Sequence, residues 1–158
     1  MVTLSQSMSF EWPASVVWEY LVAFEQVPHW EHGVLEVRQL VPGEPVVGTP
    51  ISARRIYAGV PTELIGEIVE YAPGRQATLE LRSGPHRGTR VRYAVEPVTA
   101  TSCKVTYSAT VDLRGPLRLL GPVIPILGRH ETRKNLRRLR RRIGAEISPR
   151  SDEPTPDA

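Results

Sequence analysis

The sequence predicts an α+β fold in which a long C-terminal helix lies across a seven-stranded antiparallel sheet. Beyond Gly33, short segments rich in Val, Ile, Leu, Tyr and Thr alternate with turns that contain Gly or Pro, which is typical of an antiparallel meander. Near the end of the chain, where basic residues are concentrated, Leu136, Leu139, Ile143 and Ile147 recur at helical spacing. The length of 158 residues suits one domain, which we expect to span residues 1–147.

The first elements are a strand and two short helices. Residues 3–10 form the predicted strand, and Pro13 opens a helix because proline suits a first helical turn. The buried face of this helix is predicted from apolar residues at positions i, i+3, i+4 and i+7, namely Val17, Tyr20, Leu21 and Phe24. A second helical turn is predicted over residues 27–33, closed by a glycine that can adopt a left-handed cap conformation.

Six more strands complete the sheet. We predict them at residues 34–41, 49–58, 62–72, 76–83, 88–96 and 103–113. Alternation is clearest in the last two, where Val91, Tyr93 and Val95 oppose charged neighbours, so one face of the sheet is apolar. Prolines interrupt the apolar segment that follows, so the final continuous helix is predicted to start near Ile124.

The ends of the chain and its single cysteine bound the setting of the protein. Residues 148–158 hold three prolines, three acidic residues and no large apolar residue, which predicts a disordered tail. No apolar run reaches the length of a spanning helix and no signal peptide is evident, so we expect a cytoplasmic protein. Cys103 has no cysteine to pair with and is interpreted as an ordinary strand residue.

The positive charge is concentrated in one helix. Residues 129–142 carry eight basic side chains and one acidic side chain, whereas residues 1–128 carry 11 basic and 12 acidic ones. The favoured interpretation is a solvated helix face, and we expect no specific nucleic-acid partner. A surface for an acidic partner, RNA or peripheral membrane contact remains the alternative, through Arg133, Arg137, Arg140 and Arg141.

Four short segments, in this order of elements, resemble the START-like (SRPBCC) superfamily of polyketide cyclases and lipid-transfer proteins. They are Pro13–Trp18, Pro28–Val34, Glu70–Arg75 and Gly88–Val91, and the resemblance spans residues 4–146. It implies the Bet v 1-like helix-grip fold, in which a curved sheet and a long helix enclose a hydrophobic pocket. It also implies a hydrophobic small-molecule ligand such as a lipid, sterol, quinone, hormone or polyketide intermediate.

Other chemistries have little support in the sequence. His29 and His32 lie three residues apart, but no third histidine or cysteine is near, so a solvated pair is favoured over a metal site. No Gly-x-Ser-x-Gly nucleophile elbow is present, and no Gly-rich phosphate-binding loop occurs. We therefore expect no metal and no cofactor.

The candidate ligand contacts follow from strand alternation and from the resemblance. Tyr93 and Tyr107 lie on the apolar phase of neighbouring strands, where a buried hydroxyl needs a partner. Trp30 matches a family position at the pocket mouth. Core packing is an equally good interpretation of each. The full predicted set is Trp30, Tyr57, Leu79, Leu81, Tyr93, Tyr107 and Val111.

One predicted strand carries Arg54, Arg55 and Tyr57. Because side chains alternate along a strand, one arginine faces the apolar side unless a bulge intervenes. A buried arginine needs a carboxylate, which Glu67 on the next strand could supply, and such a pair could polarise a ligand carbonyl. The favoured interpretation is instead an outward arginine, with its partner folded onto the sheet surface.

The sequence thus supports three functions in order. The first is binding or transport of a hydrophobic small molecule in a cavity under the C-terminal helix, by a monomer or weak homodimer. The gate would be the segment Pro122–Pro125 and the loops near Gly59 and Gly84. The second is a polyketide cyclase or aromatase in which Arg55, Tyr93 or Tyr107 hydrogen-bonds developing enolates. The third is an interaction module that uses the basic helix.

Overall fold

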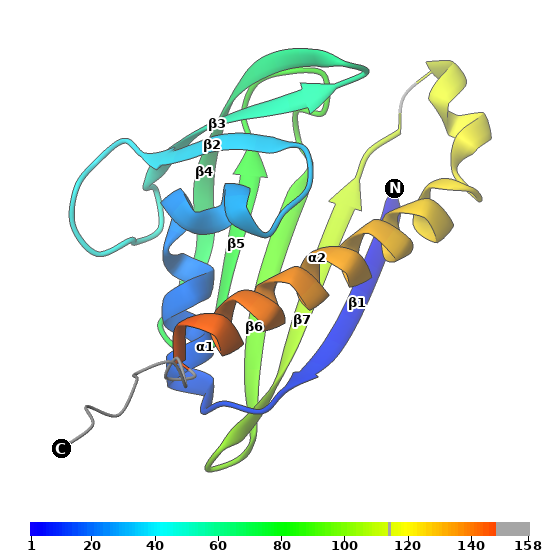
Figure 1. The fold of residues 1–158 in the computed structure, drawn as a ribbon. Coiled ribbons are helices and arrows are strands. Elements are labelled where there is room, and N and C mark those ends of the chain that lie inside the picture. Colours follow the sequence, from blue (N-terminus) through cyan, green and yellow to red (C-terminus); the bar gives the residue numbers. More distant parts are fainter. Residues whose placement is uncertain (114, 148–158) are drawn as a thin grey trace, which may run out of the picture.

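The computed structural model describes residues 1–113 and 115–147 (Figure 1). The tail predicted at residues 148–158 lies outside the described residues. No helix in the described part of the chain is long and apolar enough to cross a membrane. The described elements are β1 (Val2–Phe10), α1 (Ala14–Val22), η1 (Phe24–His29), β2 (Val34–Gln39), β3 (Pro50–Tyr57), β4 (Val60–Ala72), β5 (Gln76–Leu81), β6 (Arg90–Thr99), β7 (Ser102–Val111), η2 (Gly115–Leu120) and α2 (Ile124–Ile147).

The seven strands form one antiparallel sheet in the order β1-β7-β6-β5-β4-β3-β2, so β1 closes the edge beside the last strand. This confirms the predicted sheet and element order. Strand ends differ by a few residues. For example, β6 continues to Thr99 because this residue still pairs with Ser102 across a register shift, and β2 ends at Gln39, two residues early.

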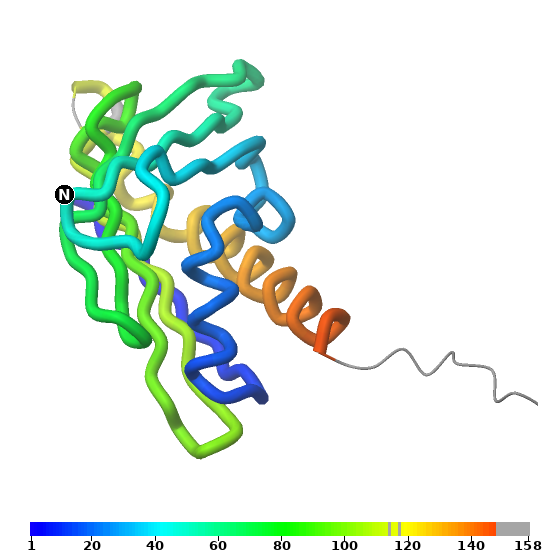
Figure 2. The backbone as a smooth tube through the Cα atoms, turned by 90° about the vertical axis from the view of Figure 1, so that its left-hand side faces the viewer, coloured from blue at the N-terminus to red at the C-terminus, as the bar shows by residue number. Residues whose placement is uncertain are grey.

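All helices that bury residues lie on one face of the curved sheet (Figure 2). The final helix α2 begins at Ile124, as predicted, and Pro125 falls in its first turn, where a missing N–H leaves no hydrogen bond unmade. Its predicted buried stripe is confirmed for Leu136, Leu139 and Ile143, which are at most 1% exposed. The prediction is wrong for Ile147, which is 42% exposed because it is the last residue of the helix. These side chains belong to one core cluster with Phe10 of β1 and residues of α1, β6 and β7.

The helix α2 packs against β1, at one edge of the sheet. Gly128 allows a close approach there, because a Cβ atom at this position would lie 2.6 Å from Cδ2 of Leu4. The other half of the concave face is covered by η1, which packs on β2. η1 is a 3₁₀ helix over Phe24–His29 and not the turn predicted at residues 27–33; Gln26 donates its amide to the Ala23 carbonyl at 2.9 Å. Different helices therefore cover the two halves of the sheet: α2 covers the β1 edge, and η1 covers the β2 edge.

Candidate functional site

The concave face of β2–β6 holds a cavity of about 100 Å³ beneath η1 and the residues that follow it. Its lining is mainly aliphatic and aromatic. The polar side chains in it are Glu31, Arg55, Tyr57, Thr78 and Tyr93. No described residue of α2 lines this cavity, which corrects the prediction that it lies under the C-terminal helix. The reason is that α2 packs against β1 at the edge of the sheet. There its buried side chains Leu136, Leu139 and Ile143 are part of the hydrophobic core and occupy the space beneath the helix.

Glu31 is the central polar residue of the cavity. It follows η1 and is only 6% exposed. Its amide donates to the Val27 carbonyl at 2.8 Å, and the next amide, that of His32, donates to Oδ1 of Asn135 on α2 at 3.1 Å. The backbone around Glu31 is thus tied both to η1 and to the long helix. These bonds direct a carboxylate into a largely apolar space, where it needs partners.

Arg55 is the first partner of Glu31. Its Nη1 donates to Oε1 of Glu31 at 2.9 Å, and its side chain is 35% exposed. Arg54 points to the opposite, exposed face of β3, where it lies across from Glu63. The outward arginine favoured from the sequence is therefore wrong for Arg55. No bulge interrupts the pairing of β3 with β4, so strict alternation places one arginine inside.

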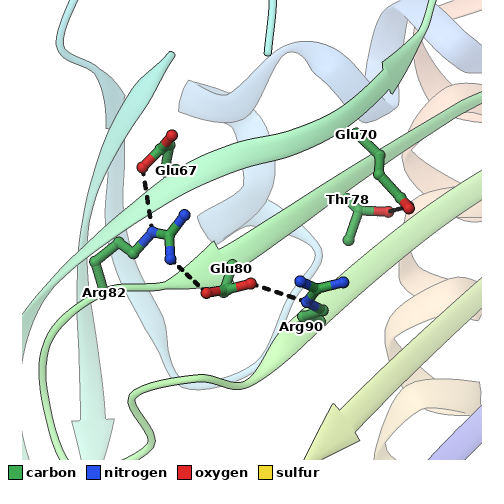
Figure 3. A network of polar contacts seen from close by, with 6 residues as sticks. All are labelled: Glu67, Glu70, Thr78, Glu80, Arg82 and Arg90. Carbon is green, nitrogen blue, oxygen red and sulfur yellow. Dashed lines mark hydrogen bonds and ion pairs between the residues drawn. The ribbon is translucent and has the colours of Figure 1, made fainter. Parts of the chain in front are cut away.

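Glu67 does not serve as the partner of the inward arginine, which corrects the second part of that prediction. It lies on the outer face of the sheet and accepts from Nε of Arg82 at 3.1 Å (Figure 3). Arg82 and Arg90 also donate to Glu80, so these charges form a network of their own. The partner of Arg55 comes from a distant part of the chain, the turn after η1.

Tyr93 is the second partner of Glu31. Its hydroxyl donates to Oε2 of Glu31 at 3.1 Å, so the two carboxylate oxygens receive different donors. The Tyr93 ring packs edge-on against Trp30, with ring centroids 6.0 Å apart, and against Tyr107, with centroids 5.3 Å apart. Tyr93 and Tyr107 are direct cross-strand neighbours on β6 and β7. Aromatic contacts of this kind hold the Tyr93 hydroxyl in place.

The protonation of these groups follows from burial and charge. Burial, followed by the negative charge of Glu31, raises the pKa of Tyr93 well above its ordinary value of 10.0. The same two causes raise the pKa of Tyr107, and burial raises that of Tyr57. Burial by itself lowers the pKa of Arg55, but the charge and hydrogen bond of Glu31, together with Tyr107 and Tyr57, raise this pKa overall. At neutral pH the site therefore offers a charged guanidinium and neutral hydroxyl donors.

The structure separates the candidate ligand contacts into two groups. Tyr57, Leu79, Leu81 and Tyr93 line the cavity, and so does Arg55. Trp30, Tyr107 and Val111 are absent from the described lining. The rings of Trp30 and Tyr107 pack against the Tyr93 ring, so these two residues contact a cavity residue without lining the cavity. Val111 is the last residue of β7, opposite Val2 of β1.

The remaining chemistry-bearing residues lie apart from the cavity. His29 is the last residue of η1, His32 follows in the next turn, and both are exposed. Among the described residues, no group of three His, Cys, Asp or Glu side chains could hold a metal ion. Cys103 is fully buried in the core, and burial raises the pKa of its thiol. A thiol in this state is a poor nucleophile.

Sequence reasoning missed Glu31, although it looked for an acidic partner of an inward arginine. His29 and His32 raise the question of a metal site in the segment Pro28–Val34, and a solvated histidine pair gives no indication that the carboxylate between them is buried. The available signal was that this segment also carries the family resemblance. A carboxylate between a tryptophan and a histidine in such a segment is a candidate for a buried role.

Most of the chain matches one protein-family model. The model is described as polyketide cyclase/dehydrase and lipid transport, and it matches residues 1–144. No curated protein matches the chain in sequence.

Three solved structures share the fold. A START superfamily protein from Mycobacterium smegmatis is 16% identical, with a TM-score of 0.78 over 92% of this chain and 99% of that one. A protein from Thermus thermophilus is 15% identical, with a TM-score of 0.75 over 92% and 99%. The Zhui aromatase/cyclase from Streptomyces sp. R1128 is 12% identical, with a TM-score of 0.72 over 94% and 97%. At these identities the likeness concerns the fold.

Proposed function

Since this chain belongs to the polyketide cyclase/dehydrase and lipid transport family, we propose that it binds a hydrophobic small molecule that carries a carbonyl oxygen. The observation that carries the proposal is the composition of the cavity lining. Aliphatic and aromatic side chains make up most of it, and Arg55 stands among them with one N–H bonded to Glu31. An apolar wall with a few fixed polar groups is typical of small-molecule sites.

Arg55 supplies the specificity in this proposal. A guanidinium has five N–H donors, and the carboxylate of Glu31 engages Nη1. The other donors can reach a ligand oxygen, because the side chain is 35% exposed and lines the cavity. The pair with Glu31 is neutral overall, so the site favours an uncharged ligand with a polarisable carbonyl. A hydrogen bond from a charged donor contributes about 1.5–3 kcal/mol.

A matched pair of probes tests this proposal. 1-Tetralone and tetralin have the same fused-ring skeleton and differ in one carbonyl oxygen. We expect calorimetric titration to show tetralone binding about tenfold or more tighter than tetralin. Arg55→Met should abolish the preference, and Arg54→Met, on the opposite face of β3, should keep it. Equal affinities for the two probes, or a preference that survives Arg55→Met, would refute the role of Arg55.

The second candidate function is a cyclase or aromatase. One of the structural neighbours is an aromatase/cyclase, and Arg55 could stabilise an enolate oxygen with a charged hydrogen bond from a guanidinium N–H that Glu31 does not engage. Solvent deuterium exchange at the carbon next to the tetralone carbonyl tests this, because exchange proceeds through an enolate. Exchange above the buffer rate at saturating tetralone that disappears in saturated Arg55→Met would establish catalysis. Exchange at the buffer rate would leave a binding protein.

A further inference from the structure

Five exposed aliphatic side chains lie in η2, in the first turn of α2 and between these two helices. We call this set the apolar tip. Ile126 is 67% exposed and Leu127 is 64% exposed. The tip spans η2 and the first turn of α2, which project from the β1 edge of the fold (Figure 1). Its members are Leu119, Leu120, Val123, Ile126 and Leu127. A group of exposed apolar side chains that lie close together along the chain marks an interaction site in many proteins.

The same helix continues into a stripe of basic residues on its solvent face. Lys134, Arg137 and Arg141 follow Leu127 at helical spacings of three to seven residues, so they share one side of the helix with the apolar tip. Arg133 borders them, and we call these four residues the basic stripe. All four are exposed, while Leu136, Leu139 and Ile143 occupy the opposite side. Glu131 offsets the charge only in part, at 3.8 Å from Lys134.

We propose that the apolar tip and the basic stripe together dock this protein on a bilayer that contains anionic phospholipids. The tip would enter the acyl boundary while the stripe contacts phosphate groups, as in amphipathic segments that lie in the membrane interface. From Leu127 to Arg141 the helix is about 21 Å long at 1.5 Å per residue, so a surface contact of this length suits a helix lying along the membrane.

Other partners match only half of this surface. A polyanion such as RNA would neutralise the basic stripe but would leave the apolar tip in water. A second copy of the chain would cover the tip but would bring two basic stripes together, and like charges repel. An anionic bilayer satisfies both halves because it offers a negative surface over an apolar interior. The proposal concerns α2 and η2, and it is independent of what the cavity binds.

Vesicle co-sedimentation of the full chain tests the proposal. We expect binding to phosphatidylcholine vesicles with about 30 mol% phosphatidylglycerol and none to phosphatidylcholine alone, with release at high salt. Arg137→Gln with Arg141→Gln should weaken partitioning by about 25-fold, since each basic residue contributes about fivefold. Ile126→Ser with Leu127→Ser should weaken it by at least about tenfold.

Matched controls guard against misfolding and against a general affinity for polyanions. Val98→Ser removes an aliphatic residue that is also 64% exposed, but on β6, and Arg54→Gln removes an exposed charge on β3. Both should bind vesicles like the unmodified chain. The Ile126→Ser, Leu127→Ser variant should elute from heparin at unchanged salt. Absence of binding to the anionic vesicles at low salt, equal binding to neutral ones, or earlier heparin elution of that variant would overturn the proposal.

Discussion

Replacing Arg55 with methionine removes the charged partner of a carboxylate that is almost fully inside the fold. Glu31 is 6% exposed, and it keeps only the Tyr93 hydroxyl at 3.1 Å as a side-chain donor once Nη1 of Arg55 is gone. Methionine fills a similar length of the cavity wall, so the loss of volume is small. The variant therefore isolates the cost of a buried carboxylate that has lost its counter-charge.

The magnitude follows from the burial of the two partners. Breaking a fully buried ion pair by removing one partner costs about 3–5 kcal/mol. Here the Arg55 side chain is 35% exposed, so water screens part of the interaction, and a cost of about 2–3 kcal/mol is expected. For a chain of this size the melting temperature should fall by about 5–10 °C.

Urea unfolding followed by circular dichroism at neutral pH measures this cost. The midpoint should move to lower urea while the slope of the free energy of unfolding against urea stays unchanged. Arg54→Met is the matched control, because its side chain is exposed on the other face of the same strand, and it should change stability by less than about 0.5 kcal/mol.

A double variant distinguishes the unpaired carboxylate from a packing effect. Glu31→Gln combined with Arg55→Met removes the buried charge itself, so it should be more stable than Arg55→Met alone. Two results would refute the reasoning. One is an Arg55→Met variant as stable as Arg54→Met, and the other is a double variant no more stable than the single one.

Three further predictions concern protonation, the core and the cavity rim. The raised pKa of Tyr93 means that the folded state keeps a proton that the unfolded state releases, so this contribution to stability is present below about pH 10 and is lost as pH rises. In alkaline urea titrations Tyr93→Phe should show a shallower decline, by up to about 1.4 kcal/mol per pH unit, and an unchanged slope would contradict the assignment. Leu139→Ala empties a fully buried site and should cost about 3 kcal/mol in urea unfolding, whereas Leu119→Ala, at a position 84% exposed, should cost almost nothing; equal costs would count against the packing of α2. Gly84 and Gly88 both have positive φ, at 84° and 90°, but only at Gly84 would a Cβ atom collide with Cδ2 of the cavity residue Leu64. Gly84→Ala should therefore lower both stability and tetralone affinity more than Gly88→Ala does, and calorimetric titration that finds the two variants alike would exclude the collision.

The order of strands and helices was predictable from local patterns in the sequence. Alternation over Val91–Val95 predicted the apolar face of the sheet, and the spacing of Leu136, Leu139 and Ile143 predicted the stripe that α2 buries. These patterns are local because a strand repeats every two residues and a helix every 3.6. Element ends were less accurate, since pairing such as that of Thr99 with Ser102 depends on the neighbouring strand.

The tertiary structure was needed to decide which of the two arginines on β3 faces the cavity. Alternation alone stated that Arg54 and Arg55 face opposite sides, but which side is roofed depends on how η1 packs on β2. The partner then came from residue 31, which is 24 positions away from Arg55 along the chain. Strand order alone points to Glu67, because it lies on the strand that follows β3 in the sequence.

By itself, then, the sequence determined the fold class, the apolar face and the basic composition of the last helix. The tertiary structure decided which half of the sheet remains hollow, because α2 docks on the β1 edge and leaves β2–β6 to be covered by η1. It also decided which carboxylate meets Arg55. The physical reason is that periodicity specifies the direction of a side chain relative to its own strand or helix, whereas the partner of a buried charge depends on how distant elements pack together.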